Sequence, residues 1–254
     1  MFSSEKKFEE WKLNGFGNMP ATLFHDIDST HTRMRDAATH GTAQPGALFV
    51  ADLQNNGRGR HERTWASPAG KNLYFNILIP LEGIPQNRFA QITQVAALTF
   101  AEVFRSLQKE QSQNTAQATG IEQAPQITVK WPNDILYGKS KFCGILAEIV
   151  FVPAKSGTLG GESGGDISSK PMPALNMGVG ININGDASDY AFLNRSVTTL
   201  KEIIGCKINR EKLLQALVAS LERAIGQFKA FGLSPWVEAW RKMDQFIGAR
   251  GTII

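Results

Sequence analysis

Cysteine is scarce in this sequence, with only two among 254 residues, Cys143 and Cys206. They lie far apart and form no CxxC motif, which favours a reducing compartment and therefore a cytoplasmic location. The four histidines lack the spacing of metal ligands, and no Ser/His/Asp triad can be assembled. We therefore expect neither a metal bound by side chains nor a nucleophile supplied by the protein.

Long apolar runs are also lacking. The N-terminal stretch MFSSEKKFEEWKLNGFG is charged throughout and has no apolar core of the kind that signal peptides carry. No run approaches the length of a membrane span. The net charge of +4 is mild and does not resemble the dense basic face of a nucleic-acid binder. We expect a globular domain that engages neither a membrane nor DNA.

The apolar pattern predicts an α+β fold, a mixed β-sheet covered by helices, because strands and helices do not alternate strictly. The expected strands span 23–27, 47–53, 73–80, 127–131, 142–151 and 174–184. The expected helices span 30–40, 87–109, 209–231 and 234–243, with a short helix that ends at Gly205. The polar stretch 110–126 and the Gly/Ser-rich stretch 155–171 are expected to be surface loops.

The most informative stretch runs from Gly57 to Tyr74 and reads GRGRHERTWASPAGKNLY. Its glycines let backbone N–H groups approach a ligand, its arginines can grip phosphate or carboxylate oxygens, and its indole can stack on a purine. The stretch fits either a polyanion-binding loop or a solvated basic loop. It is not a dinucleotide fingerprint, since the third glycine would fall at Glu62.

Two strands carry further candidates. In 175–184, apolar residues occupy one face and Asn or Gly the other, and glycines in mid-strand indicate that something lies close to their face. That neighbour is either a bound ligand or a tightly packed element. In the strand at 127–131, Ile127, Val129 and Trp131 are expected to share one face. Lys130 on the opposite face fits either a reactive lysine or an ordinary strand lysine.

Four motifs in this order resemble those of biotin protein ligases, over roughly Leu23 to Ile254. They are IDST at 27–30, the stretch from Gly57, KWPND at 130–134 followed by KFCGIL at 141–146, and GVGIN at 178–182. The resemblance implies a catalytic domain with the fold of class II aminoacyl-tRNA synthetases. It also implies the reaction: biotin and ATP form biotinyl-5′-adenylate, with Mg²⁺ carried on the nucleotide, and a lysine of a biotin carboxyl carrier domain then takes the biotin.

The resemblance further assigns residues to roles. The catalytic residues would be Lys130, Arg60 and Arg58, which offset charge as two anions react. Biotin would lie among Ser29, Thr30, Gln54, Gly57, Arg58, Lys130, Gly178 and Gly180. The nucleotide would contact Arg60, Arg63, Trp65, Asn133, Lys141 and Asn182. The loop from Gly57 is expected to be disordered without ligand and to fold over the adenylate. Glu62 departs from the family pattern and either lowers the positive field there or pairs with an arginine.

By the same resemblance, the chain divides into an N-terminal extension 1–22, a catalytic domain 23–245 and, at 246–254, the start of a C-terminal β-barrel domain. About 22 residues before the first strand are too few for a winged helix-turn-helix, which disfavours a DNA-binding regulator. A lipoate or octanoyl ligase and a non-enzymatic biotin sensor remain as alternatives, and a homodimer is left open.

Overall fold

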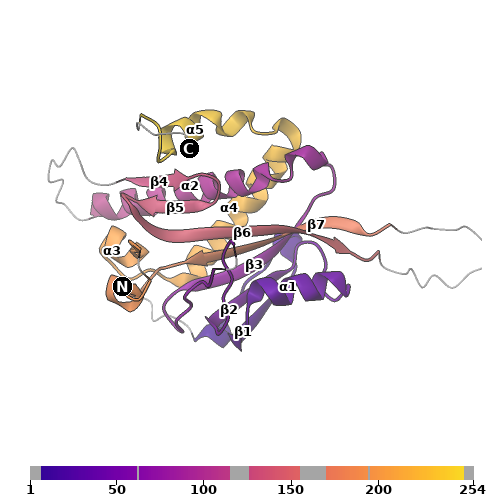
Figure 1. Ribbon diagram of the computed structural model, residues 1–254, viewed down its shortest axis with the longest axis horizontal. Helices are drawn as coiled ribbons and strands as arrows, with labels where there is room; N and C mark the ends of the chain where they lie inside the picture. The colour runs from indigo at the N-terminus through magenta and orange to yellow at the C-terminus, as the bar shows by residue number, and fades with distance from the viewer. Residues whose placement is uncertain (1–6, 62, 115–125, 155–169, 194, 249–254) are drawn as a thin grey trace, which may run out of the picture.

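The computed structural model describes residues 7–61, 63–114, 126–154, 170–193 and 195–248. A seven-stranded mixed sheet in the order β1-β2-β3-β7-β6-β5-β4 forms its centre (Figure 1). Strands β1 and β2 run parallel, and the other neighbouring pairs are antiparallel. The predicted α+β architecture is therefore confirmed.

The sheet and helices have the following bounds. The strands are β1 Ala21–Ile27, β2 Leu48–Gln54, β3 Leu73–Pro80, β4 Ile127–Lys130, β5 Asp134–Tyr137, β6 Ser140–Val152 and β7 Met172–Ile181. The α-helices are α1 Thr30–Thr39, α2 Gln91–Asn114, α3 Leu200–Ile204, α4 Arg210–Phe231 and α5 Val237–Met243. Short 3₁₀ turns occur at Phe8–Glu10, Phe16–Asn18, Gln86–Arg88, Ala187–Tyr190 and Ser234–Trp236.

Helices cover both faces of the sheet (Figure 1). On one face, α2 and α4 close the main core, in which the apolar residues of β7 from Leu175 to Ile181 are buried. On the other face, Met34 and Ala38 of α1 pack against a smaller apolar cluster that includes Leu78 and Val150. The alternation predicted for β7 is confirmed, so its Asn/Gly face points toward the side that α1 covers only in part.

Three local differences from the sequence prediction have simple causes. Strand β5 lies where the sequence predicted no strand, because its four residues are too few to display a period. Helix α2 continues to Asn114, since Glu and Gln at the start of the expected loop have good helix propensity. Strand β4 ends at Lys130, so Trp131 leaves the alternation and is 60% exposed.

The segment before β1 belongs to the main core. Phe8, Trp11, Leu13 and Phe16 are buried in it, and the Arg210 guanidinium lies 5.0 Å from the centre of the Trp11 ring. At the other end, Phe246 and Ile247 are exposed. Most of the two expected loops, and residues 249–254, lie outside the described residues. No helix in the described ranges is long and apolar enough to cross a membrane.

Candidate ligand pocket

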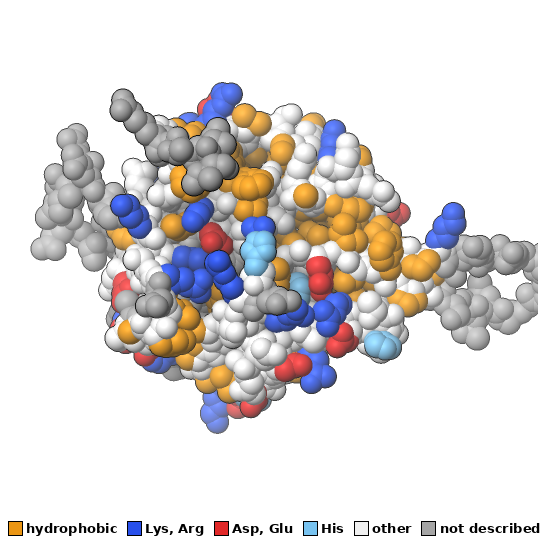
Figure 2. Space-filling model, in the orientation of Figure 1, with side chains coloured by type: hydrophobic (Ala, Val, Ile, Leu, Met, Phe, Trp, Pro, Cys, Tyr) orange, Lys and Arg blue, Asp and Glu red, His pale blue; other side chains and the backbone are white. Residues whose placement is uncertain are grey.

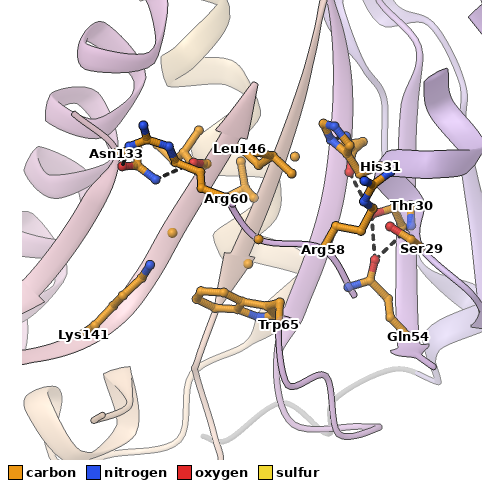
Figure 3. A pocket seen from close by; sticks show the side chains of 17 residues that line it. Ser29, Thr30, His31, Gln54, Arg58, Arg60, Trp65, Asn133, Lys141 and Leu146 are labelled. Atoms are coloured by element: carbon orange, nitrogen blue, oxygen red, sulfur yellow. Dashed lines mark hydrogen bonds between the residues drawn. The ribbon is translucent and has the colours of Figure 1, made fainter. Parts of the chain in front are cut away.

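A pocket lies over the glycine face of β7, between the start of α1 and the loop from Gly57 (Figure 3). Ten of the fourteen predicted site residues line it: Ser29, Thr30, Gln54, Arg58, Arg60, Trp65, Asn133, Lys141, Gly178 and Gly180. The sequence therefore predicted a set of side chains that come from four separate segments and meet in space. Figure 2 shows Lys and Arg side chains gathered in the middle of this face of the molecule.

The loop from Gly57 folds back on itself like a hairpin. The Trp65 N–H donates to the Gly57 carbonyl at 2.8 Å, and the Gly59 N–H donates to the Arg63 carbonyl at 2.7 Å. Residue 62 lies outside the described part, so the expected effect of Glu62 stays a prediction. The expected disorder of the loop without ligand also stays a prediction.

Gly57 is required by the close packing of this loop. A Cβ atom at this position would lie 2.6 Å from the Trp65 carbonyl oxygen and 2.8 Å from Ser67 Oγ, closer than real Cβ contacts come. Gly57 and Arg63 line a neighbouring depression rather than the pocket itself. Gly57 thus shapes the loop, while its predicted contact with biotin stays a prediction.

Arg60 is held over the pocket by a buried asparagine. Its Nη1 donates to Asn133 Oδ1 at 2.9 Å, and Asn133 Nδ2 donates to the Ile145 carbonyl at 2.9 Å. Because the second bond fixes which way the Asn133 amide points, its oxygen faces the guanidinium. Asn133 therefore positions Arg60, and the remaining guanidinium N–H groups can bind an anion.

Lys141 brings a second cation to the pocket. Its Nζ lies 2.6 Å from Asp134 Oδ1 and 5.1 Å from the centre of the Trp65 ring. Burial lowers the pKa of Lys141, and the Asp134 carboxylate acts in the opposite direction. A partly desolvated ammonium beside a pocket gains more from an anionic ligand than an exposed one does.

The Trp65 indole lies on a shelf made by two glycines. Gly144 of β6 and Gly180 of β7 are paired across the sheet. Added Cβ atoms would approach the indole to 2.8 Å at Gly144 and 2.4 Å at Gly180. The close neighbour that the mid-strand glycines predicted is thus, at Gly180, the packed side chain of Trp65. Since the pocket keeps only about 50 Å³ of free volume, room for a few water molecules, a larger ligand requires Trp65 to move.

Besides Gly57 and Arg63, two predicted residues lie outside this lining. Lys130 is exposed at the end of β4, with its Nζ 6.0 Å from the centre of the Phe246 ring. Asn182 follows β7, and its backbone N–H donates to the Phe142 carbonyl at 2.8 Å. The structure does not bring either side chain into the pocket, and their roles stay predictions.

Polar residues at the pocket floor extend the predicted set. Ser29 caps the start of α1, since its Oγ accepts from the Thr32 N–H at 3.4 Å. Thr30 donates its N–H to Gln54 Oε1 at 2.9 Å. His31 and Asn76 also line the pocket but were not predicted. A lone asparagine inside the apolar run LYFNILIP was the available signal for Asn76, because such a residue needs a buried partner.

The pocket combines three cationic side chains, Arg58, Arg60 and Lys141, with a neutral polar end at Ser29, Thr30 and Gln54. Such a site suits a ligand that has an anionic part and a polar, uncharged head. Within the described residues, no group of three or more His, Cys, Asp or Glu side chains could hold a metal ion.

Comparison with known proteins gives consistent matches. The chain is 30% identical over 221 residues to the bifunctional ligase/repressor BirA of Escherichia coli. This match covers 87% of this chain and 58% of that protein. It is 24% identical over 224 residues to the biotin–[acetyl-CoA-carboxylase] ligase of Mycobacterium tuberculosis. This match covers 87% of this chain and 70% of that enzyme. The chain thus spans less than two thirds of BirA.

Among solved structures, the biotin protein ligase from Aquifex aeolicus in complex with biotin and ATP superposes with a TM-score of 0.66 and 22% identity, over 88% of this chain and 78% of that one. This likeness confirms the predicted biotin-ligase-like fold of the catalytic domain. The sequence model of the Biotin/lipoate A/B protein ligase family matches residues 23–160, which is more than half of the chain and includes most of the pocket. This chain therefore belongs to the biotin/lipoate A/B protein ligase family.

Proposed function

We propose that this chain is an ATP-dependent biotin protein ligase of the biotin–[acetyl-CoA-carboxylase] type. The observation that carries the proposal is the single pocket in which Arg58, Arg60 and Lys141 face a neutral polar end. Biotin has the matching form, with a carboxylate at one end and an uncharged cyclic urea at the other. The names of the relatives, which include a biotin–[acetyl-CoA-carboxylase] ligase, support the same activity.

The reaction takes two steps. The biotin carboxylate attacks the α-phosphorus of ATP, and pyrophosphate leaves to give biotinyl-5′-adenylate. A carrier-domain lysine then attacks the carbonyl of this mixed anhydride, forms an amide and releases AMP. In the first step two anions meet, so Arg58, Arg60 and Lys130 offset charge and hold the reactants in line. Mg²⁺ carried on the nucleotide would neutralise phosphate charge.

Around this chemistry we propose the remaining assignments. Ser29, Thr30 and Gln54 contact the biotin head above Gly178 and Gly180, while Trp65, Asn133, Lys141, Arg63 and Asn182 serve the nucleotide. Residues 23–245 form the catalytic domain, with an extension before it and a further domain beginning at 246–254. The protein partner is a biotin carboxyl carrier domain, and DNA is not a partner. Whether the chain forms a homodimer is left open. Cys143 and Cys206 are free, which supports a cytoplasmic location.

Incubation of the chain with labelled biotin, MgATP and a biotin carboxyl carrier domain tests the proposed function. We expect ATP-dependent label on the carrier lysine. Label transferred instead from lipoate or octanoate would identify a lipoate-type ligase. Biotin binding without adenylate or transfer would identify a sensor.

Arg60→Ala is expected to weaken retention of the adenylate as well as its synthesis. Loss of one hydrogen bond to a charged group is worth about 1.5–3 kcal/mol. Activated biotin should therefore leak and label bystander lysines, which streptavidin blotting of an added bystander protein measures at matched turnover.

Arg223→Ala provides the matched control, because Arg223 is exposed on α4, where it donates to Ser220 Oγ at 3.1 Å. Equal bystander labelling by Arg60→Ala and the parent would show that Arg60 does not retain the adenylate.

A further inference from the structure

A network of polar side chains lies beneath the Thr30 end of the pocket. It joins His31 of α1, Asn76 of β3, Glu148 of β6 and Asn176 of β7. Asn76, Asn176 and His31 are buried, whereas the Glu148 side chain is 34% exposed at the edge of the network. Because water is largely excluded around the three buried residues, each of their donors needs an acceptor, and the contacts determine which way these groups point.

Asn176 sets the direction of the network. Its Nδ2 lies 3.0 Å from the His31 carbonyl oxygen and 3.0 Å from Glu148 Oε1. Burial raises the pKa of the Glu148 carboxyl, but the hydrogen bonds from His31 and Asn176, together with nearby positive charge that includes Arg35, leave the pKa below its ordinary value, so the group is an ionised acceptor. Both neighbours of the Asn176 nitrogen are thus acceptors, and the Asn176 oxygen must face Asn76.

Asn76 and His31 follow from this orientation. Asn76 Nδ2 donates to Asn176 Oδ1 at 2.6 Å, and its second hydrogen points at His31 Nδ1, which is 3.0 Å away. His31 Nδ1 is therefore the acceptor nitrogen, and its Nε2 carries the hydrogen that it donates to Glu148 Oε1 at 3.1 Å. The remaining group of Asn76, its carbonyl oxygen, faces Thr30.

The Thr30 hydroxyl lies between two acceptors. Its Oγ1 is 2.8 Å from Asn76 Oδ1 and 3.0 Å from Gln54 Oε1. The Gln54 amide cannot flip without loss, because its oxygen accepts the Thr30 N–H and its nitrogen donates to Ser67 Oγ. A hydroxyl has one hydrogen, so Thr30 donates inward and keeps only lone pairs for a ligand in the pocket.

We propose that His31, Asn76, Asn176 and Glu148 are positioning residues that turn the Thr30 hydroxyl hydrogen away from the ligand, so that Thr30 Oγ1 presents lone pairs beside Gln54 Oε1 and selects a head group bearing N–H donors. The inference rests on the proposed function and deepens it. The cyclic urea of biotin has two N–H donors, whereas the dithiolane of lipoate and the alkyl chain of octanoate have none. A head group without them leaves buried acceptors unpaired, which costs binding.

The test compares biotin with its two cyclic carbamate analogues, in which one ureido N–H is replaced by oxygen. The parent chain is expected to bind the disfavoured analogue about 5- to 150-fold more weakly than biotin. In Asn76→Leu the Thr30 hydroxyl keeps only Gln54 Oε1, its longer contact at 3.0 Å, as an acceptor within the protein and can turn toward the ring oxygen, so the difference should shrink to less than about 5-fold. Asn87→Leu, at an exposed position before α2, should keep the parental ratio.

An unchanged ratio in a folded Asn76→Leu protein that binds biotin would overturn the network and leave the proposed function standing. A second measurement needs no ligand. In ¹⁵N spectra of the parent chain, with the His31 signals assigned by their loss in His31→Gln, Nε2 should carry a hydrogen and Nδ1 should carry none. Finding a hydrogen on Nδ1 would overturn the inference even if the chain bound no biotin.

Discussion

Lys130→Ala slows formation of biotinyl-5′-adenylate by about 10²–10³-fold, the usual cost of losing one group that stabilises developing charge. The fold should be unaffected, because Lys130 is exposed at the end of β4. Biotin-dependent exchange between ATP and pyrophosphate measures the loss. Lys139→Ala, an exposed lysine in the turn between β5 and β6, should exchange at the parental rate.

The position of Lys130 makes this a sharp test. Its ammonium rests near the Phe246 ring, outside the pocket, although Asn133 three residues later lines the pocket. A cation–π contact at an exposed site is worth only about 0.5–1 kcal/mol, so the side chain leaves Phe246 at little cost. A flexible ammonium is also suited to charge that appears only as the reactants meet.

Lys141 is the competing assignment, because the structure places this lysine in the pocket. Lys141→Ala is expected to weaken ATP binding and so to raise the KM for ATP more than it lowers kcat. If Lys130→Ala exchanged at a near-parental rate while Lys141→Ala lost the exchange reaction, the catalytic role would pass to Lys141.

The sequence predicted best those features that depend on local order. The alternation in β7 identified both faces of the strand, and the glycines at 178 and 180 correctly indicated a close neighbour. Strand β5 was not predicted, because a four-residue strand between Pro132 and Gly138 is too short to show a period of apolar residues. The predicted end of β4 was one residue too late. Trp131 continues the apolar alternation of the sequence, but the strand itself ends at Lys130.

The pocket floor could not be predicted in this way. Asn76 and Asn176 are 100 residues apart, and their hydrogen bond exists only because β3 and β7 are neighbours in the sheet. No local sequence pattern predicts the order of the strands in the sheet. Trp65 is a similar case, because the motif indicated a stacking residue, while its seat on Gly144 and Gly180 depends on the pairing of β6 with β7.

Gly180→Val should abolish biotin binding while costing little stability. A Cβ atom at position 180 would lie 2.4 Å from the Trp65 ring, and valine adds two further methyl groups on the same side. The strand itself tolerates valine well, because β-branched residues favour extended backbone. The strain therefore falls on Trp65, which sits on a surface loop and can swing away, and the valine then fills the shelf on which we place the ligand.

Isothermal titration with biotin and thermal unfolding measure the two effects separately. Gly226→Val is the matched control, since an added Cβ there on α4 meets no atom within 4 Å, and this variant should bind biotin normally. A Gly180→Val protein that unfolds at the parental temperature and binds no biotin would place the ligand on the glycine face, where Trp65 now lies. Parental biotin affinity in that protein would instead mean that the glycines exist to seat Trp65 and that biotin binds elsewhere.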